Sequence, residues 1–303
     1  MKRPKKKFGV LEITKYLIFI VFAIWAFYYI SELTSKENLR EAFNKVPWWV
    51  CLGSIVGSFI NWTWESLKWH KLINTIQYSS LLTSSKAVYS GAAVNNILPF
   101  KLGEYLGKLY YVQADKRALS VPLSFISSTI QLFVNLILCI GPAMYLLGLQ
   151  ATQKLNFVNI SITFVVIIIG LLVVQKSPKT KDWITKLKEN FKLLTIKIIA
   201  QITLFAILRF LSFLLAYVFV IYSLTDLDLA QIIIGICAIY FMQSFAPGMV
   251  LTDGPVRILL PLLVFIPMGV PEATLIVAAI INYLASVILP SIFGVFFILL
   301  PKT

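Results

Sequence analysis

Long apolar segments follow one another along almost the whole chain, and this succession constrains the fold more than any other feature. A soluble domain of 303 residues could not bury them: 59% of the residues are hydrophobic and only 13% are charged, about half the ~25% usual in soluble domains. The composition excludes a cytosolic enzyme, a disordered chain and a fibrous protein. It predicts an all-α polytopic integral membrane protein with a single transmembrane domain over residues 1–303. The clear segments are 16–31, 47–63, 120–148, 157–174, 198–222, 229–246, 256–270 and 273–300, with a weaker one at 86–99.

The basic residues are distributed unevenly between the loops that join these segments. Of 27 lysines and arginines, 21 lie in 1–15, 64–119, 175–197 or the C-terminal tail, whereas the loops 32–46 and 149–156 hold three and one. This alternation sets orientation, because short loops rich in lysine and arginine stay in the cytoplasm. We therefore expect a basic cytoplasmic N-terminus at 1–15 and a cytoplasmic C-terminus. The net charge of +14 then reflects orientation and not nucleic-acid binding.

This orientation also limits how the apolar segments can cross the membrane. Residues 64–119 begin and end on the cytoplasmic side and yet contain an apolar stretch. Residues 223–271 begin outside and must return there before the last span. We therefore expect about six full transmembrane helices and two re-entrant, broken-helix hairpins, at 86–114 and 229–270.

The two hairpins occupy corresponding places in two halves of the chain. The halves read as an inverted repeat, the first copy at about 47–148 and the second at about 198–300. Broken backbone at membrane depth is tolerated only where it is buried in protein or lines a water-filled cavity. Paired interruptions of this kind indicate a binding site near the bilayer midplane.

The first interruption joins two asparagines, a proline, a glycine and an acid–base pair. The proline lacks an N–H group and disturbs the incoming helix, and the glycine permits a turn or a close backbone approach. The acid begins a new helix and has the last base four positions later on its face. The candidate binding residues are Asn95, Asn96, Pro99, Lys101, Gly103, Glu104 and Lys108.

The second interruption repeats this order with different residues. A proline and a glycine are followed by an acid, a second glycine and a base four positions after the acid. The candidates here are Pro247, Gly248, Asp253, Gly254 and Arg257. In both hairpins the alternative interpretation is an ion pair that only closes the hairpin.

Arg209 lies near the middle of the apolar segment 198–222. An arginine at that depth costs about 2.5–3.5 kcal/mol on insertion scales, so we expect it to face the protein interior and to pair with an acid. Glu104 and Asp253 are the predicted partners. The sequence predicts no catalytic residue, no cofactor and no metal site, because its three cysteines lie within apolar segments and it has one histidine.

The stretch Asn96-Ile97-Leu98-Pro99-Phe100-Lys101-Leu102-Gly103-Glu104 resembles the N-x-L-P-x-R-x-G-E signature of the lysylphosphatidylglycerol synthase transmembrane-region family. It departs at Lys101, where arginine is usual. In the second half Pro247-Gly248 stands where the family has P-G-G-x-G and a glutamate. Met249 replaces the second glycine, and Asp253 stands in for the glutamate. The resemblance covers nearly the whole chain in segment pattern.

The resemblance implies a flippase-like membrane domain, present here without the aminoacyl-transferase domain, in a prokaryotic inner membrane. Its substrate would be a polar-headed phospholipid or lipid-linked precursor moved between leaflets. The other expected partners are further copies of the same chain, in a homo-oligomer, and a separate lipid-modifying enzyme. Two alternatives remain open: a proton-coupled transporter of a small solute, since intramembrane acids and broken helices suit it equally, and a membrane-embedded transferase that uses a polyprenyl-phosphate-linked sugar.

Overall fold

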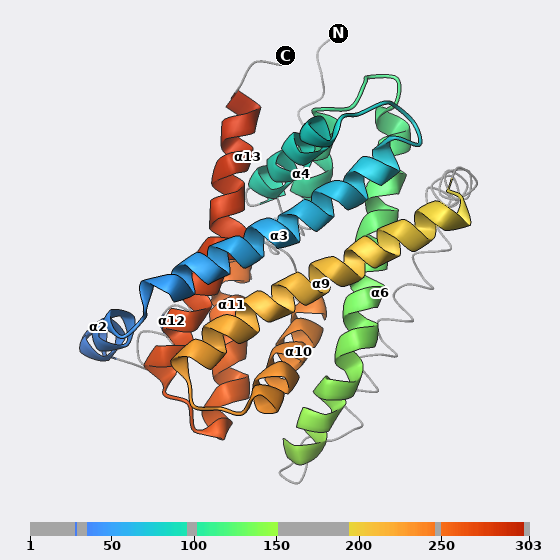
Figure 1. Cartoon of the computed structure of the whole chain (residues 1–303). Coiled ribbons are helices and arrows are strands. Elements are labelled where there is room, and N and C mark those ends of the chain that lie inside the picture. Colours follow the sequence, from blue (N-terminus) through green and yellow to red (C-terminus); the bar gives the residue numbers. More distant parts are fainter. Residues whose placement is uncertain (1–27, 29–34, 96–101, 151–193, 246–249, 300–303) are drawn as a thin grey trace, which may run out of the picture.

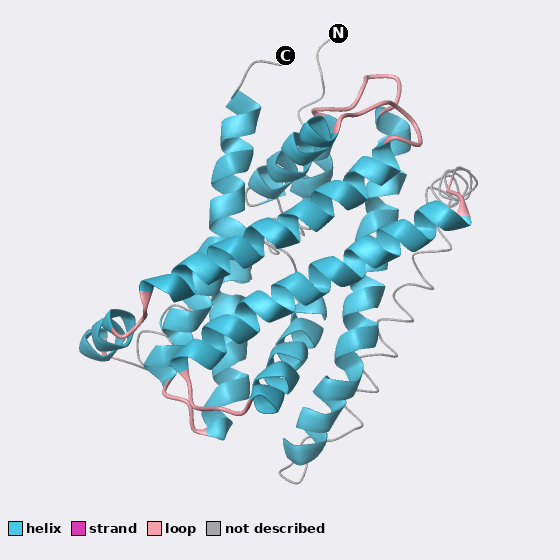
Figure 2. Ribbon diagram, in the orientation of Figure 1, coloured by secondary structure: helices cyan, strands magenta, loops and turns pink. Residues whose placement is uncertain are grey.

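The computed structural model describes residue 28 and the ranges 35–95, 102–150, 194–245 and 250–299. Within these residues the chain is helical and has no strand (Figure 2). The all-α prediction is therefore confirmed for the described part of the chain. Several predicted site residues lie outside it: Asn96, Pro99, Lys101, Pro247 and Gly248.

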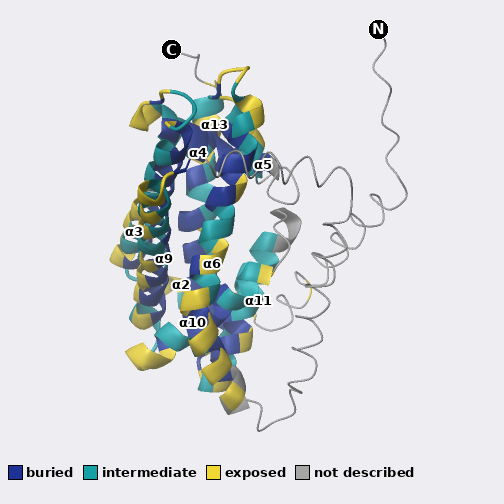
Figure 3. Cartoon of the chain, turned by 90° about the vertical axis from the view of Figure 1, so that its right-hand side faces the viewer, coloured by how far each residue is buried: buried dark blue, intermediate teal, exposed yellow. Residues whose placement is uncertain are grey.

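Two long helices lie side by side along one face of the molecule (Figure 1). They are α3 (Trp48–Ile73) and α9 (Ile196–Leu224). Gly57 lets them approach, because an added Cβ there would lie 2.5 Å from the Cβ of Ala216. A short helix, α2 (Lys36–Asn44), precedes α3 and is capped by Ser35, whose side chain accepts a hydrogen bond from the backbone N–H of Asn38. Exposed residues mark the outer edges of α3 and α9 in Figure 3.

The first predicted hairpin forms two short helices packed against each other. They are α4 (Leu81–Asn95) and α5 (Leu102–Leu109). Their backbones meet at Gly91 and Gly107, where an added Cβ on Gly107 would lie 2.5 Å from the Cα of Gly91. The long helix α6 (Arg117–Gln150), which contains two prolines, completes this half.

The second half also begins with a long helix that is followed by two shorter ones. After α9, helices α10 (Leu229–Phe245) and α11 (Val250–Phe265) pack together. A 3₁₀ turn, η2 (Ile266–Met268), ends at Gly269, whose φ of 85° suits glycine. The chain then continues through α12 (Glu272–Tyr283), a π-helical segment η3 (Leu284–Ile288) and α13 (Leu289–Leu299).

The π-helical segment lies where the intrahelical hydrogen-bond pattern must break. Pro290 has no N–H group to donate to a carbonyl of the preceding turn. Helix α3 provides donors instead. The Ser58 hydroxyl donates to the carbonyl oxygen of Ala285 at 2.7 Å, and Trp62 Nε1 donates to that of Ser286 at 3.1 Å. The sequence thus places a donor pair on α3 opposite the carbonyls that the π-helical segment leaves free.

Three described helices are long and apolar enough to cross a membrane: Arg117–Leu146, Ile196–Leu224 and Glu272–Leu299. The predicted segments 120–148, 198–222 and 273–300 correspond to them. The predicted segment 47–63 ends too early, because α3 continues to Ile73 through charged residues that face the protein interior. The count of six spans and the inverted repeat stay predictions.

Candidate functional site

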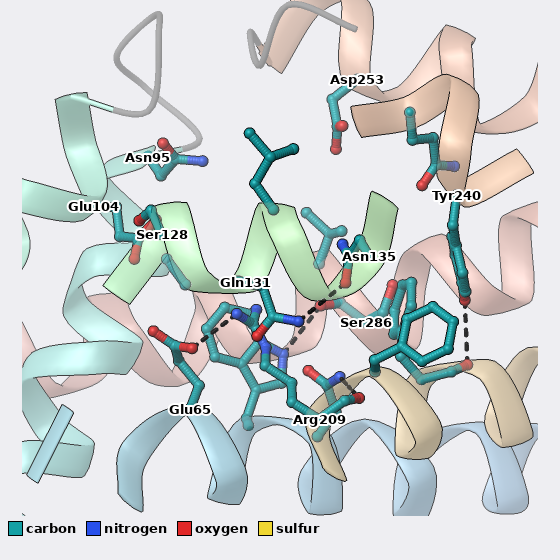
Figure 4. Close-up of a pocket in the computed structure, with 18 of the residues that line it drawn as sticks. Glu65, Asn95, Glu104, Ser128, Gln131, Asn135, Arg209, Tyr240, Asp253 and Ser286 are labelled. Atoms are coloured by element: carbon teal, nitrogen blue, oxygen red, sulfur yellow. Dashed lines mark hydrogen bonds and ion pairs between the residues drawn. The ribbon is translucent and has the colours of Figure 1, made fainter. Parts of the chain in front are cut away.

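A polar cavity of about 310 Å³ lies between the two halves. Asn95 and Glu104 approach it from the first hairpin, and Tyr240 and Asp253 from the second, with α6 between them (Figure 4). Helices α3 and α9 contribute side chains on another side. Seven charged residues line it: Glu65, Lys68, Glu104, Lys108, Arg209, Asp253 and Arg257.

Glu65 of α3 is the centre of the larger ionic cluster. Its Oε2 lies 2.6 Å from Lys68 Nζ and 2.7 Å from Arg209 Nη1, and its Oε1 lies 3.3 Å from Lys108 Nζ. Lys108 also contacts Glu104 Oε1 at 2.7 Å. The carboxylate of Glu65 and both lysine side chains are almost completely buried. One carboxylate therefore holds cations from α3, α5 and α9 together.

Two of these cations also lie over the rings of aromatic side chains. Lys108 Nζ lies 5.0 Å from the centre of the Trp69 ring, and Arg209 Cζ lies 5.7 Å from that of Trp62. Both distances fall within the range of cation–π attraction. The α3 helix is fixed to α9 at the same level by Asn61 Nδ2, which donates to the Arg209 carbonyl oxygen at 2.9 Å.

The second ionic pair belongs to α11. Arg257 Nε donates to Asp253 Oδ2 at 2.8 Å, and both side chains are partly exposed to the cavity. The spacing of four residues matches that of Glu104 and Lys108 on α5. The acid–base order predicted for each hairpin thus forms an ion pair in each.

An amide pair on α6 extends the network along the cavity wall. Lys68 Nζ donates to Gln131 Oε1 at 3.1 Å. Gln131 Nε2 donates to Asn135 Oδ1 at 3.0 Å and to the carbonyl oxygen of Ala206 at 3.2 Å. Gln131 therefore joins the buried charges of α3 to α6 and α9.

Substituting Gln131→Leu is expected to lower the free energy of unfolding by about 1–3 kcal/mol, because it leaves Lys68 short of an acceptor and the Ala206 carbonyl short of a donor. Unfolding in mixed detergent micelles measures the change. Gln113→Leu, the same substitution at an exposed position, is the control and is expected to change little. Equal effects at the two positions would contradict a structural role for the amide pair.

The cavity wall also carries polar atoms without a partner among the described residues. These are the Oδ1 atom of Asn95 and the hydroxyl of Ser286, both buried. A buried polar group without a hydrogen bond is costly, so such atoms mark places where water or a ligand completes the bonding.

The structure brings together six of the residues predicted from the two interruptions and from the apolar segment that contains Arg209. Gly103 packs against the backbone of Val94 and Asn95, and Gly254 lies near the Tyr283 ring and not at the cavity wall. The residues at the cavity are Asn95, Glu104, Lys108, Arg209, Asp253 and Arg257.

The predicted partners of Arg209 are wrong. Arg209 pairs with an acid, as expected, but this acid is Glu65, whereas Glu104 pairs with Lys108 and Asp253 with Arg257. Glu65 and Lys68 fall within residues 64–119, which the basic residues assign to the cytoplasmic side, because the apolar segment ends at residue 63. Their spacing of three residues, which puts both on one helix face, is the signal that could have identified them.

A comparison with protein-family models matches residues 13–294 to the lysylphosphatidylglycerol synthase transmembrane region. Searches of curated proteins and of solved structures returned no match. The family match covers most of the chain and agrees with the signature around Pro99 and Glu104. The chain therefore belongs to the lysylphosphatidylglycerol synthase transmembrane-region family and is an integral membrane domain.

Proposed function

We propose that this protein moves a polar-headed lipid between the two leaflets of a membrane. The observation that carries the proposal is the ion-paired cavity, to which both helical hairpins and both long helices α3 and α9 contribute. A headgroup cannot cross hydrocarbon cheaply, because its polar groups lose hydrogen bonds to water. A cavity lined by charges and amides replaces those hydrogen bonds part of the way across.

The outer surface supports this proposal, because it suits acyl chains. Large apolar side chains are exposed on α3, among them Leu52, Val56 and Phe59, and on α13, among them Ile292 and Phe296. A lipid can keep its acyl chains against such surfaces while its headgroup enters the polar interior. We further propose a prokaryotic inner membrane as the location, with both termini in the cytoplasm, on the distribution of basic residues.

The test is lipid translocation by purified full-length protein in liposomes. A fluorescent phospholipid labelled on an acyl chain is present in trace amounts, and a reductant added outside bleaches only the outer leaflet. Wild-type protein is expected to raise the bleached fraction above the half reached in protein-free vesicles. Glu104→Gln and Arg209→Ala are expected to slow this exchange strongly.

Two exposed residues of α2 provide matched controls, Glu41→Gln and Arg40→Ala, which should keep the wild-type rate. The assignment of the site is wrong if Glu104→Gln and Arg209→Ala also keep that rate. Translocation itself is wrong if wild-type protein leaves every labelled phospholipid at the protein-free level.

A further inference from the structure

The described charges at the cavity do not balance. Four bases, Lys68, Lys108, Arg209 and Arg257, face three carboxylates, which leaves a net charge of +1 among the described lining residues. A charge held away from bulk water is costly unless an opposite charge accompanies it. The cavity therefore favours a ligand that brings one negative charge.

The four bases differ in how accessible they are to a ligand in the cavity. The side chains of Lys68 and Lys108 are 1% exposed; Lys68 contacts Glu65 and Gln131, and Lys108 contacts Glu65 and Glu104. Arg209 and Arg257 are 24% and 21% exposed, but Arg257 has the carboxylate of Asp253 to itself among the described ion pairs. Arg209 donates to Glu65 through Nη1 alone, and it shares the single negative charge of Glu65 with Lys68 and Lys108. Its other N–H groups form no hydrogen bond with a described residue and can bind phosphate oxygens in a fork.

The uncharged part of the wall indicates what accompanies the phosphate. Asn135 and Ser128 line the cavity from α6 (Figure 4). The Asn95 Oδ1 atom and the Ser286 hydroxyl, which have no partner among the described residues, lie on other helices. Carbonyl oxygens accept, and hydroxyl groups both donate and accept. A ligand that carries hydroxyl groups satisfies them, whereas an ammonium group would add to the positive excess.

We infer that the ligand class of this cavity is an anionic phosphodiester lipid with an uncharged, hydroxyl-bearing headgroup, its phosphate bound at Arg209. The inference rests on the proposed lipid translocation and specifies its substrate. Lipids with a cationic aminoacylated headgroup are disfavoured, because their ammonium groups meet a cavity that is already positive.

Binding to the detergent-purified full-length protein tests the inference. The probes are short-chain phosphatidylglycerol, phosphatidylcholine and lysylphosphatidylglycerol, followed by thermal unfolding. Phosphatidylglycerol is expected to bind at least about tenfold more tightly than the other two, a ratio that like-charge repulsion readily supplies. Arg209→Gln should remove this preference, and Arg40→Gln on α2 should keep it. Equal binding of the three lipids, or tighter binding of the lysyl lipid, overturns the inference.

A charge-balanced pair of variants separates net charge from local damage. Arg257→Gln reduces the described net charge to zero and is expected to weaken the preference. Asp253→Asn combined with Arg257→Gln restores +1 and is expected to recover it. Failure of the double variant to exceed the single one contradicts the role assigned to net charge.

The deacylated headgroup, glycerophosphoglycerol, distinguishes a lipid from a soluble phosphodiester. Weaker binding of this compound than of phosphatidylglycerol supports a lipid ligand. Equal binding upholds the phosphodiester site and counts against lipid translocation. Selective binding of phosphatidylglycerol without exchange in liposomes likewise upholds the ligand class and rejects the proposed function, so the two can fail separately.

Discussion

Replacing Glu65 by glutamine is expected to lower the free energy of unfolding by about 3–5 kcal/mol, the cost of breaking a buried ionic network by removing one partner. Glu65 is the only described residue that contacts Lys68, Lys108 and Arg209 together. Without it these three cations keep one carboxylate, Glu104, among the residues of the cluster. Equilibrium unfolding in mixed detergent micelles measures the loss, and translocation in liposomes is expected to fall with it.

Two variants make this prediction specific. Glu41→Gln removes the same charge from an exposed position on α2 and is expected to leave stability unchanged. Glu65→Gln combined with Lys68→Met restores the net charge of the cluster and is expected to recover part of the loss. If Glu65→Gln alone stays within about 1 kcal/mol of the wild type, the three contacts do not stabilise the fold as argued.

The second large effect is expected from Gly107→Val, which should lower the free energy of unfolding by about 3 kcal/mol through overpacking. A Cβ at this position would lie 2.5 Å from the Cα and N atoms of Gly91, which belong to backbone and cannot rotate away. Helices α4 and α5 would have to separate, and Glu104 and Lys108 would move with α5.

Gly148→Val on α6 is the matched control, because an added Cβ at Gly148 has no neighbour within 4 Å. This control carries the same change in helix propensity and therefore isolates the clash. Unfolding in mixed detergent micelles compares the two. A similar loss of stability at both positions would show that contact between α4 and α5 does not limit the first hairpin.

Helices whose apolar character extends over their full length were predicted well. Residues 198–222 correspond closely to α9, and residues 273–300 to the helix Glu272–Leu299. A continuous apolar run of that length is typical of a membrane-spanning helix and of few other structures. The spacing of four residues also indicates that acid and base share a helix face in α5 and in α11, and the ion pair of the alternative interpretation forms in both.

The centre of the site was not predicted, and the reason is physical. Glu65 and Lys68 reduce the hydropathy of α3, so the sequence alone ends the apolar segment at residue 63. In the structure they are buried because each satisfies the other's charge, at 2.6 Å, and because cations from α5 and α9 join them. Contacts over 43 and 144 residues of sequence separation leave no periodic signal.

The π-helical segment of the last helix restricts how the cavity can change shape. Its carbonyl groups at Ala285 and Ser286 depend on donors from α3, so parting α3 from this helix would leave both groups without partners in a medium that offers few. The two helices must therefore travel as one rigid body. If the cavity opens alternately to the two sides of the membrane, the moving parts at this level are the helix pairs α4–α5 and α10–α11, which shift relative to that rigid body.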